Sequence, residues 1–183
     1  ARKDSKVLTV LGAGTVAASM VDAYREIFPL LETIYVWNHR YEKAQQFAEK
    51  KQVIPIRELA EAVNAADIIS SATSSTEPFI RGEWLRKGCH LDLIGAFRPD
   101  MREAQDSAVT RGIIFVDSFT TALHDIGELG MGVQGGQEFP ARPAGVDQSV
   151  DVARAFVVLR PSFANAELGG PIQDQTVGAL LGM

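Results

Sequence analysis

The segment at residues 12–17 constrains the fold of this chain more than any other. It reads Gly-Ala-Gly-Thr-Val-Ala, a G-x-G-x-x-A pattern. The preceding residues 6–11 are mostly apolar and rich in β-branched side chains, which predicts a buried strand. Residues 15–28 carry apolar side chains at helical spacing and stop before Pro29, which predicts a helix. The pattern therefore stands at a junction between a strand and a helix.

Glycines at this junction have a physical use in binding a dinucleotide. Gly12 permits a tight turn out of the strand, and Gly14 lets a pyrophosphate approach the backbone. The small Ala17 lets the helix lie close to the sheet. The free N–H groups at the start of the helix, around Thr15 and Val16, face the phosphates with the positive end of the helix dipole. The alternative is a glycine turn in some other α/β fold.

The rest of the chain alternates between predicted strands and helices. Strands are predicted at residues 33–37, 53–54, 67–72, 90–96 and 113–117, and helices at 41–51 and 57–64. This alternation predicts an α/β fold with a Rossmann-type, doubly wound parallel sheet covered on both faces. We expect this NAD(P)-binding domain to span residues 1–130. We expect residues 131–183 to form a divergent, partly irregular C-terminal segment, in which 151–159 suit a helix or a strand.

The composition excludes several classes of protein. The chain has 183 residues and a formal net charge of −5, with scattered basic residues, which disfavours nucleic-acid and membrane-surface binding. Cys89 is the single cysteine, so no disulfide forms within the chain and a reducing compartment is expected. No apolar run reaches the ~18 residues of a membrane span. We therefore expect a cytoplasmic protein that binds neither nucleic acid nor membrane.

The end of the second predicted strand favours NADP over NAD. NAD sites place a carboxylate there for the ribose hydroxyls, but this strand is followed by Asn38, His39 and Arg40. Arg40 can form a fork onto a 2′-phosphate with help from His39, and Asn38 can bond ribose or phosphate oxygens. The alternative is an ordinary solvated arginine, in which case NAD remains possible.

Other strand ends supply further candidates for cofactor binding, because ligands of open parallel sheets lie at the carboxyl ends of strands. The candidates are Ala72, Thr73, Ser74, Gly95, Phe97 and Asp117. The hydroxyls and N–H groups of residues 72–75 suit either contacts to the ribose or nicotinamide side of the cofactor or a capped surface loop. Phe97 suits either a nicotinamide wall or the core, and Asp117 suits either the cofactor or a helix cap.

Motifs for other chemistry are missing from the sequence. There is no HExxH or other metal-ligand spacing and no G-x-S-x-G elbow. His90, at the start of a strand, is expected to be structural, and His124 to lie on a helix surface. If the chain is part of an enzyme, the cofactor therefore supplies the reactivity, and the residues single out no catalytic side chain.

Several stretches resemble the ornithine cyclodeaminase/mu-crystallin family. They are GAGTVA, VWNHRYEKAQQFAEK, ADIISSATSSTEPFIRGEWLRKGCHLDLIGAFRPDMREAQD and GIIFVDSFTTALHDIGEL, over residues 6–129. The resemblance implies a Rossmann domain and a separate domain for substrate binding and dimerisation, built mainly from a segment preceding the Rossmann part. On this resemblance we expect the chain from Ala1 to be without that segment and its cationic groups for a substrate carboxylate. We therefore expect a fragment or a truncated relative of homodimeric proteins.

The resemblance also ranks the possible activities. Ornithine cyclodeaminases carry an aspartate in a G-x-D-x-P-G-K pattern where Phe97 stands here, and phenylalanine cannot transfer a proton. The RPDMRE and WNHR stretches are similar to the branch of NADPH-binding mu-crystallin and the cyclic ketimine reductases. This implies NADPH-dependent hydride transfer to the C=N bond of a cyclic imino acid of the Δ1-pyrroline-2-carboxylate or Δ1-piperideine-2-carboxylate type, in proline metabolism. The alternatives are an NAD-dependent cyclodeaminase, making proline and ammonia from ornithine, and a non-catalytic NADPH-binding module.

Overall fold

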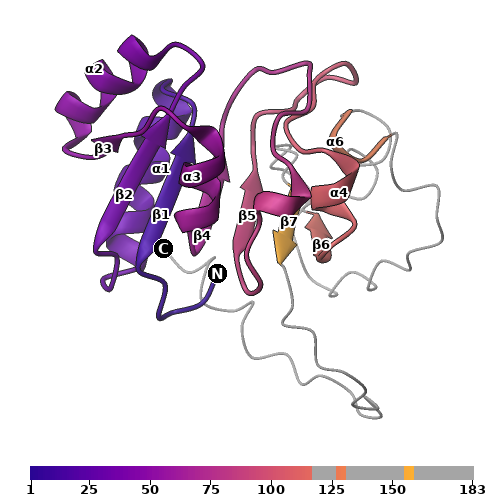
Figure 1. The fold of residues 1–183 in the computed structure, drawn as a ribbon, viewed down its shortest axis with the longest axis horizontal. Coiled ribbons are helices and arrows are strands. Elements are labelled where there is room, and N and C mark those ends of the chain that lie inside the picture. The colour runs from indigo at the N-terminus through magenta and orange to yellow at the C-terminus, as the bar shows by residue number, and fades with distance from the viewer. Residues whose placement is uncertain (117–126, 131–154, 159–183) are drawn as a thin grey trace, which may run out of the picture.

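A computed structural model describes residues 1–116, 127–130 and 155–158 (Figure 1). The strands are β1 (Val7–Leu11), β2 (Thr33–Trp37), β3 (Ile54–Pro55), β4 (Ile68–Ser71), β5 (His90–Leu93), β6 (Ile113–Val116) and β7 (Ala155–Val158). The helices are α1 (Thr15–Ile27), α2 (Tyr41–Lys51), α3 (Leu59–Ala65), α4 (Asp106–Val109) and α6 (Gly127–Gly130), with a 3₁₀ turn η1 (Gly82–Trp84). The strands form one seven-stranded sheet in the order β3-β2-β1-β4-β5-β7-β6.

This order confirms the prediction of a Rossmann-type sheet. Strands β3, β2, β1, β4 and β5 are parallel neighbours, and the direction of winding reverses between β1 and β4. Strand β7 pairs antiparallel with both β5 and β6, a pairing that the sequence pattern did not specify. It comes from the 151–159 run that suited a helix or a strand, since a short apolar run has no decisive period.

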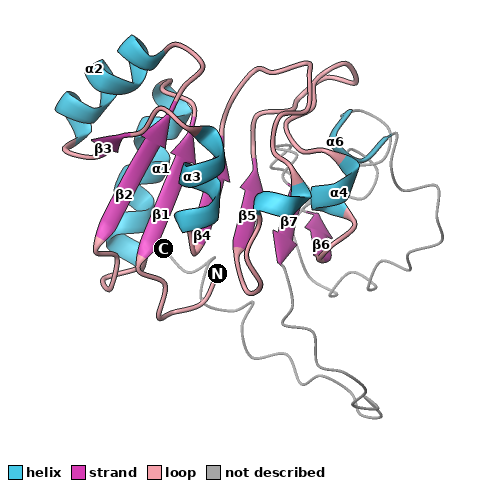
Figure 2. Ribbon diagram, viewed as in Figure 1, coloured by secondary structure: helices cyan, strands magenta, loops and turns pink. Residues whose placement is uncertain are grey.

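The two faces of the sheet carry separate hydrophobic cores, with helices on each (Figure 2). Leu8 and Val10 of β1 point to the face covered by α1 and α2, where they meet Ala17 and Val21. Leu11 points to the opposite face, which α3, η1 and α4 cover. Alternation along a strand with both faces covered explains why β1 reads as a continuous apolar run.

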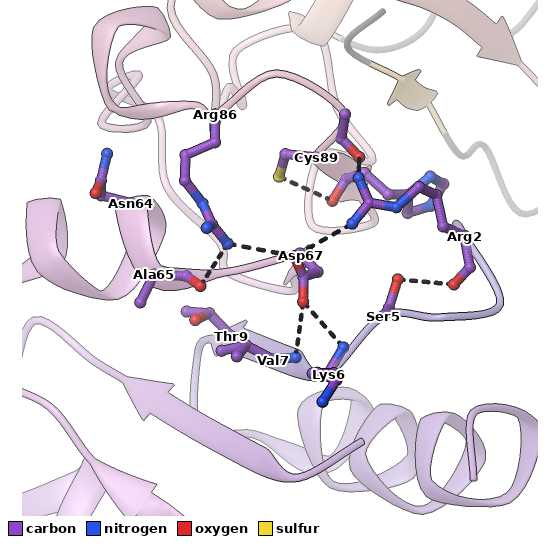
Figure 3. Close-up of polar contacts among 12 residues, drawn as sticks. Arg2, Ser5, Lys6, Val7, Thr9, Asn64, Ala65, Asp67, Arg86 and Cys89 are labelled. Atoms are coloured by element: carbon purple, nitrogen blue, oxygen red, sulfur yellow. Dashed lines mark hydrogen bonds and ion pairs between the residues drawn. The ribbon is translucent and has the colours of Figure 1, made fainter. Parts of the chain in front are cut away.

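Asp67 fixes the amino end of β4 beside the amino end of β1 (Figure 3). Its Oδ2 accepts hydrogen bonds from the backbone N–H groups of Lys6 and Val7, at 2.9 and 3.1 Å. The guanidinium groups of Arg86 and Arg2 lie 3.3 and 3.5 Å from its Oδ1. Although partial burial acts in the opposite direction, these bonds and charges together lower the pKa of Asp67. Pinning these ends sets the register that brings the other ends of β1 and β4 together.

None of the helices in the described ranges is long and apolar enough to cross a membrane. The longest of them, α1, has 13 residues, against about 20 for a membrane span.

Candidate cofactor-binding site

The turn after β1 has a shape that glycine alone fits without strain. Gly12 has a φ of +111°, and its N–H donates to the Trp37 carbonyl of β2 at 2.9 Å. A Cβ atom at Gly12 would lie 2.5 Å from the Ala72 carbonyl oxygen, far inside van der Waals contact. The turn after β1 is thus pressed against the segment that follows β4, at the point where the winding reverses.

The second glycine of the motif faces open space instead. Gly14 is exposed, and a Cβ atom there would meet nothing within 4 Å. It precedes α1, which has no side-chain cap and no acidic residue in its first turn. Thr15 and Val16 are exposed, whereas Ala17 is fully buried against the sheet. The uncapped N–H groups and the dipole of this 13-residue helix therefore favour an anion over Gly14.

The turn after β2 carries the polar residues expected to meet the adenosine side. Oδ1 of the half-buried Asn38 accepts a hydrogen bond from the Arg40 N–H at 3.0 Å, which closes the turn. The side chains of His39 and Arg40 are exposed. In the described part of the chain, no carboxylate lies within ion-pair distance of Arg40. Its guanidinium is therefore available to an anion.

A buried glutamate holds together the carboxyl ends of β4 and β5. Oε1 of Glu103 accepts from the Ser71 hydroxyl at 2.6 Å, the Thr73 hydroxyl at 2.6 Å and the Thr73 N–H at 2.7 Å. Its Oε2 accepts from the Gly95 N–H at 2.8 Å. Glu103 is fully buried, and burial raises its pKa while these donors oppose the rise. The carboxylate is a tether between the two loops that follow the carboxyl ends of β4 and β5.

A second buried glutamate holds Glu103 in place. Oε2 of Glu128, in α6, accepts from the Glu103 N–H at 2.8 Å, and its Oε1 accepts from the Ala104 N–H at 2.7 Å. Burial raises the pKa of Glu128 to about 7, and the nearby Glu103 charge adds to this rise against the two N–H donors. The Gly127 N–H donates to the Arg98 carbonyl at 3.0 Å, so α6 also holds the loop after β5.

The raised pKa of Glu128 predicts a dependence of stability on pH. Folded protein binds the Glu128 proton more tightly than unfolded protein, so stability falls as pH rises from about 4.5 to about 7. The Glu128→Gln variant lacks this titration. Relative to the wild type, we expect its free energy of unfolding to rise by up to about 3 kcal/mol between pH 5 and pH 8.

Urea unfolding at several pH values measures this difference. Glu49→Gln is a suitable control, because it replaces an acidic side chain that is exposed on α2. A wild type and a Glu128→Gln variant with parallel pH profiles would contradict the predicted titration.

The remaining predicted site residues differ in what the structure allows them to do. Glu103 accepts hydrogen bonds from the N–H and hydroxyl of Thr73 and from the N–H of Gly95. The Ala72 N–H donates to the Leu11 carbonyl at 2.8 Å, while Ser74 is exposed beside them. Phe97 is 68% exposed, so its expected alternative role in the core is wrong.

The structure describes one of three further residues that the sequence singled out, namely His90, Asp117 and His124. His90 is buried in β5, and burial lowers its pKa to about 4, so it is neutral as expected of a structural residue. Asp117 and His124 lie outside the described residues.

The sequence reasoning did not single out Glu103 or Glu128. Both stand in stretches that carry the family resemblance, but no spacing links either residue to the strand ends that they hold. Within the described ranges, no cluster of three or more His, Cys, Asp or Glu side chains could hold a metal ion.

Comparison with known proteins agrees with this geometry. The profile of the ornithine cyclodeaminase/mu-crystallin family matches residues 1–172. A Δ1-pyrroline-2-carboxylate reductase of Paracoccus denitrificans is 46% identical over 141 residues, which are 74% of this chain and 45% of that protein. The ketimine reductase mu-crystallin of Rattus norvegicus is 39% identical over 127 residues, 68% of this chain and 40% of that protein.

A solved structure has a similar fold. Δ1-Pyrroline-2-carboxylate reductase of Thermococcus litoralis, in complex with NADH and L-proline, superposes with a TM-score of 0.57 at 29% identity. The match covers 62% of this chain and 36% of that one. The chain thus spans less than half the length of these relatives. The family profile, the identities and the glycine turn at the reversal point of the sheet together show that this chain belongs to the ornithine cyclodeaminase/mu-crystallin family.

Proposed function

We propose that this chain is the NADPH-binding part of a reductase that acts on cyclic imino acids. The observation that carries the proposal is the turn after β1, where Gly12 fits tightly and Gly14 leaves open space at the uncapped start of α1. Those features suit a diphosphate, and the nicotinamide of a bound cofactor would supply the hydride. The similarity to a Δ1-pyrroline-2-carboxylate reductase and to ketimine reductase mu-crystallin supports the substrate class.

The residues of this chain would bind and orient the cofactor. Gly14 and the first N–H groups of α1 would hold the diphosphate, and Arg40 with His39 would hold a 2′-phosphate. Glu103 would keep the loops after β4 and β5 at a fixed distance from the diphosphate turn. Fixed geometry of this kind is most of what hydride transfer requires from the protein.

The preference for NADPH rests on the charge at the end of β2. A 2′-phosphate carries close to two negative charges, and the exposed Arg40 has no carboxylate partner among the described residues. A carboxylate at this end, as in NAD sites, would repel that phosphate. We therefore expect NADPH to bind at least about 10-fold more tightly than NADH, as one charge-assisted contact can give.

Two measurements test the proposed function. Fluorescence titrations of the 183-residue chain with NADPH and with NADH should give the expected preference, and equal affinities would contradict it. The product of the complete gene should then oxidise NADPH with Δ1-pyrroline-2-carboxylate. Binding without turnover on cyclic imines would instead favour a non-catalytic NADPH-binding module. Formation of proline and ammonia from ornithine would favour a cyclodeaminase.

A further inference from the structure

Arg57 lies at the carboxyl end of β3, next to the end of β2. In the parallel β2–β3 pair, Val36 is opposite Pro55, so Asn38 and Arg57 each come two residues after a paired residue. The Ile56 N–H donates to the Val36 carbonyl at 3.0 Å, which continues the pairing past Pro55. Arg57 therefore emerges at the same sheet edge as the turn at residues 38–40.

Two contacts fix the position of Arg57. Nε1 of Trp37, the last residue of β2, donates to the Arg57 carbonyl at 3.0 Å. The guanidinium carbon of Arg57 lies 3.7 Å from the centre of the Tyr41 ring. Tyr41 is the first residue of α2 and directly follows Arg40. The Arg57 charge is thus held beside the backbone from which Arg40 projects.

Stacking leaves the hydrogen-bonding groups of Arg57 free. A guanidinium that stacks on a ring uses its face, and its N–H groups point outward in its plane. Arg57 is exposed, and in the described ranges no carboxylate lies within ion-pair distance of it. Glu42 and Glu58, the nearest acids in sequence to Arg40 and Arg57, form no ion pair with them. Two unpaired cations therefore lie at one sheet edge.

We propose that Arg57 is a specificity-determining residue, a second cation that binds the 2′-phosphate of the cofactor together with Arg40. This inference rests on the proposed NADPH function and adds a residue from a different strand to it. A dianionic phosphate between two guanidinium groups satisfies both charges, whereas NADH would leave them facing a neutral hydroxyl. The Tyr41 ring orients Arg57 before the cofactor arrives, which reduces the entropy lost on binding.

The Arg57→Met variant tests this assignment, because methionine is unbranched and removes the charge. We expect its affinity for NADPH to fall on the order of 10- to 100-fold, with the affinity for NADH changed less than about 2-fold. The probes 2′,5′-ADP and 5′-AMP should show the same contrast, since they differ in the 2′-phosphate and carry no nicotinamide. Isothermal titration calorimetry of the 183-residue chain measures all four affinities.

Arg81 offers a matched control elsewhere on the surface. It is an exposed arginine that lies 5.2 Å from the Trp84 ring centre, and Arg81→Met should leave all four affinities unchanged. Tyr41→Phe keeps the ring and should preserve the NADPH preference, while Tyr41→Ala should weaken it.

The outcomes that overturn the assignment are distinct. Equal losses for NADPH and NADH in Arg57→Met would make Arg57 a general adenosine contact, and unchanged affinities would remove it from the site. A wild-type chain that binds none of the four ligands would defeat the proposed function and this inference together. If the inference alone were wrong, the wild type would still bind NADPH, and only the Arg57→Met variant would give an unexpected result.

Discussion

Replacing Glu103 by alanine should lower the free energy of unfolding by about 4 kcal/mol. The substitution leaves the N–H groups of Thr73 and Gly95 without their acceptor, and each buried unpaired donor costs about 1–3 kcal/mol. The hydroxyl of Ser71 loses its hydrogen-bond acceptor as well. Because Glu103 is fully buried, the shorter side chain also leaves a cavity in the interior. This loss is a large part of the 5–15 kcal/mol that typically stabilises a domain.

Replacing Glu103 by glutamine removes the charge but keeps the volume of the side chain, so it separates these two contributions to stability. An amide has one acceptor oxygen, so Glu103→Gln can serve the N–H of Thr73 or that of Gly95, but not both. We expect an intermediate loss of about 2 kcal/mol, from one unpaired backbone N–H. Urea unfolding of both variants, with Glu49→Ala on the exposed face of α2 as a control, measures the order. Losses below about 1 kcal/mol for Glu103→Ala would contradict the tether.

The Glu103 tether also shows why part of the site could not be predicted from the sequence. Glu103 lies 30 residues after Thr73 and 8 after Gly95, in a stretch without helical or strand periodicity. Its role depends on the loops after β4 and β5 meeting in space, and single-sequence patterns carry no such information. The same limit applies to Thr73, because its hydroxyl and N–H both donate to Glu103, a contact that the sequence did not predict.

Elements with strong local signals were predictable. Residues 33–37 are all β-branched or aromatic, which favours a strand. Residues 41–51 place Ala44, Phe47 and Ala48 on one helical face, which the structure buries. Strand β7 had only a short apolar run, and its partners β5 and β6 lie more than 35 residues earlier in the sequence, as the register of Phe156 with Phe115 shows. The position of Arg57 beside the turn at residues 38–40 depends on the register of the two-residue strand β3, and so it was not predicted from the sequence.

The two glycines of the motif should respond oppositely to alanine. Gly12→Ala places a Cβ atom 2.5 Å from a backbone oxygen at a φ of +111°, and should cost about 2–4 kcal/mol of stability. At Gly14, φ is −95° and ψ is −171°, which alanine adopts freely, and its Cβ atom meets nothing within 4 Å. Gly14→Ala should therefore change stability by less than about 0.5 kcal/mol.

Nucleotide affinity should follow a different order from stability. The methyl group of Gly14→Ala would occupy the space through which a diphosphate reaches the backbone, so NADPH affinity should fall on the order of 30-fold in a fully stable protein. Gly88→Ala is the control, since Gly88 has a φ of +80° and lies near Arg2. It should lose stability and keep its affinity. If Gly14→Ala bound NADPH like the wild type, the open space over Gly14 would not be the diphosphate site. A Gly14→Ala variant that is stable but no longer binds NADPH, together with a Gly88→Ala variant that is less stable but still binds it, would locate the cofactor at this turn. This conclusion needs no assay of turnover.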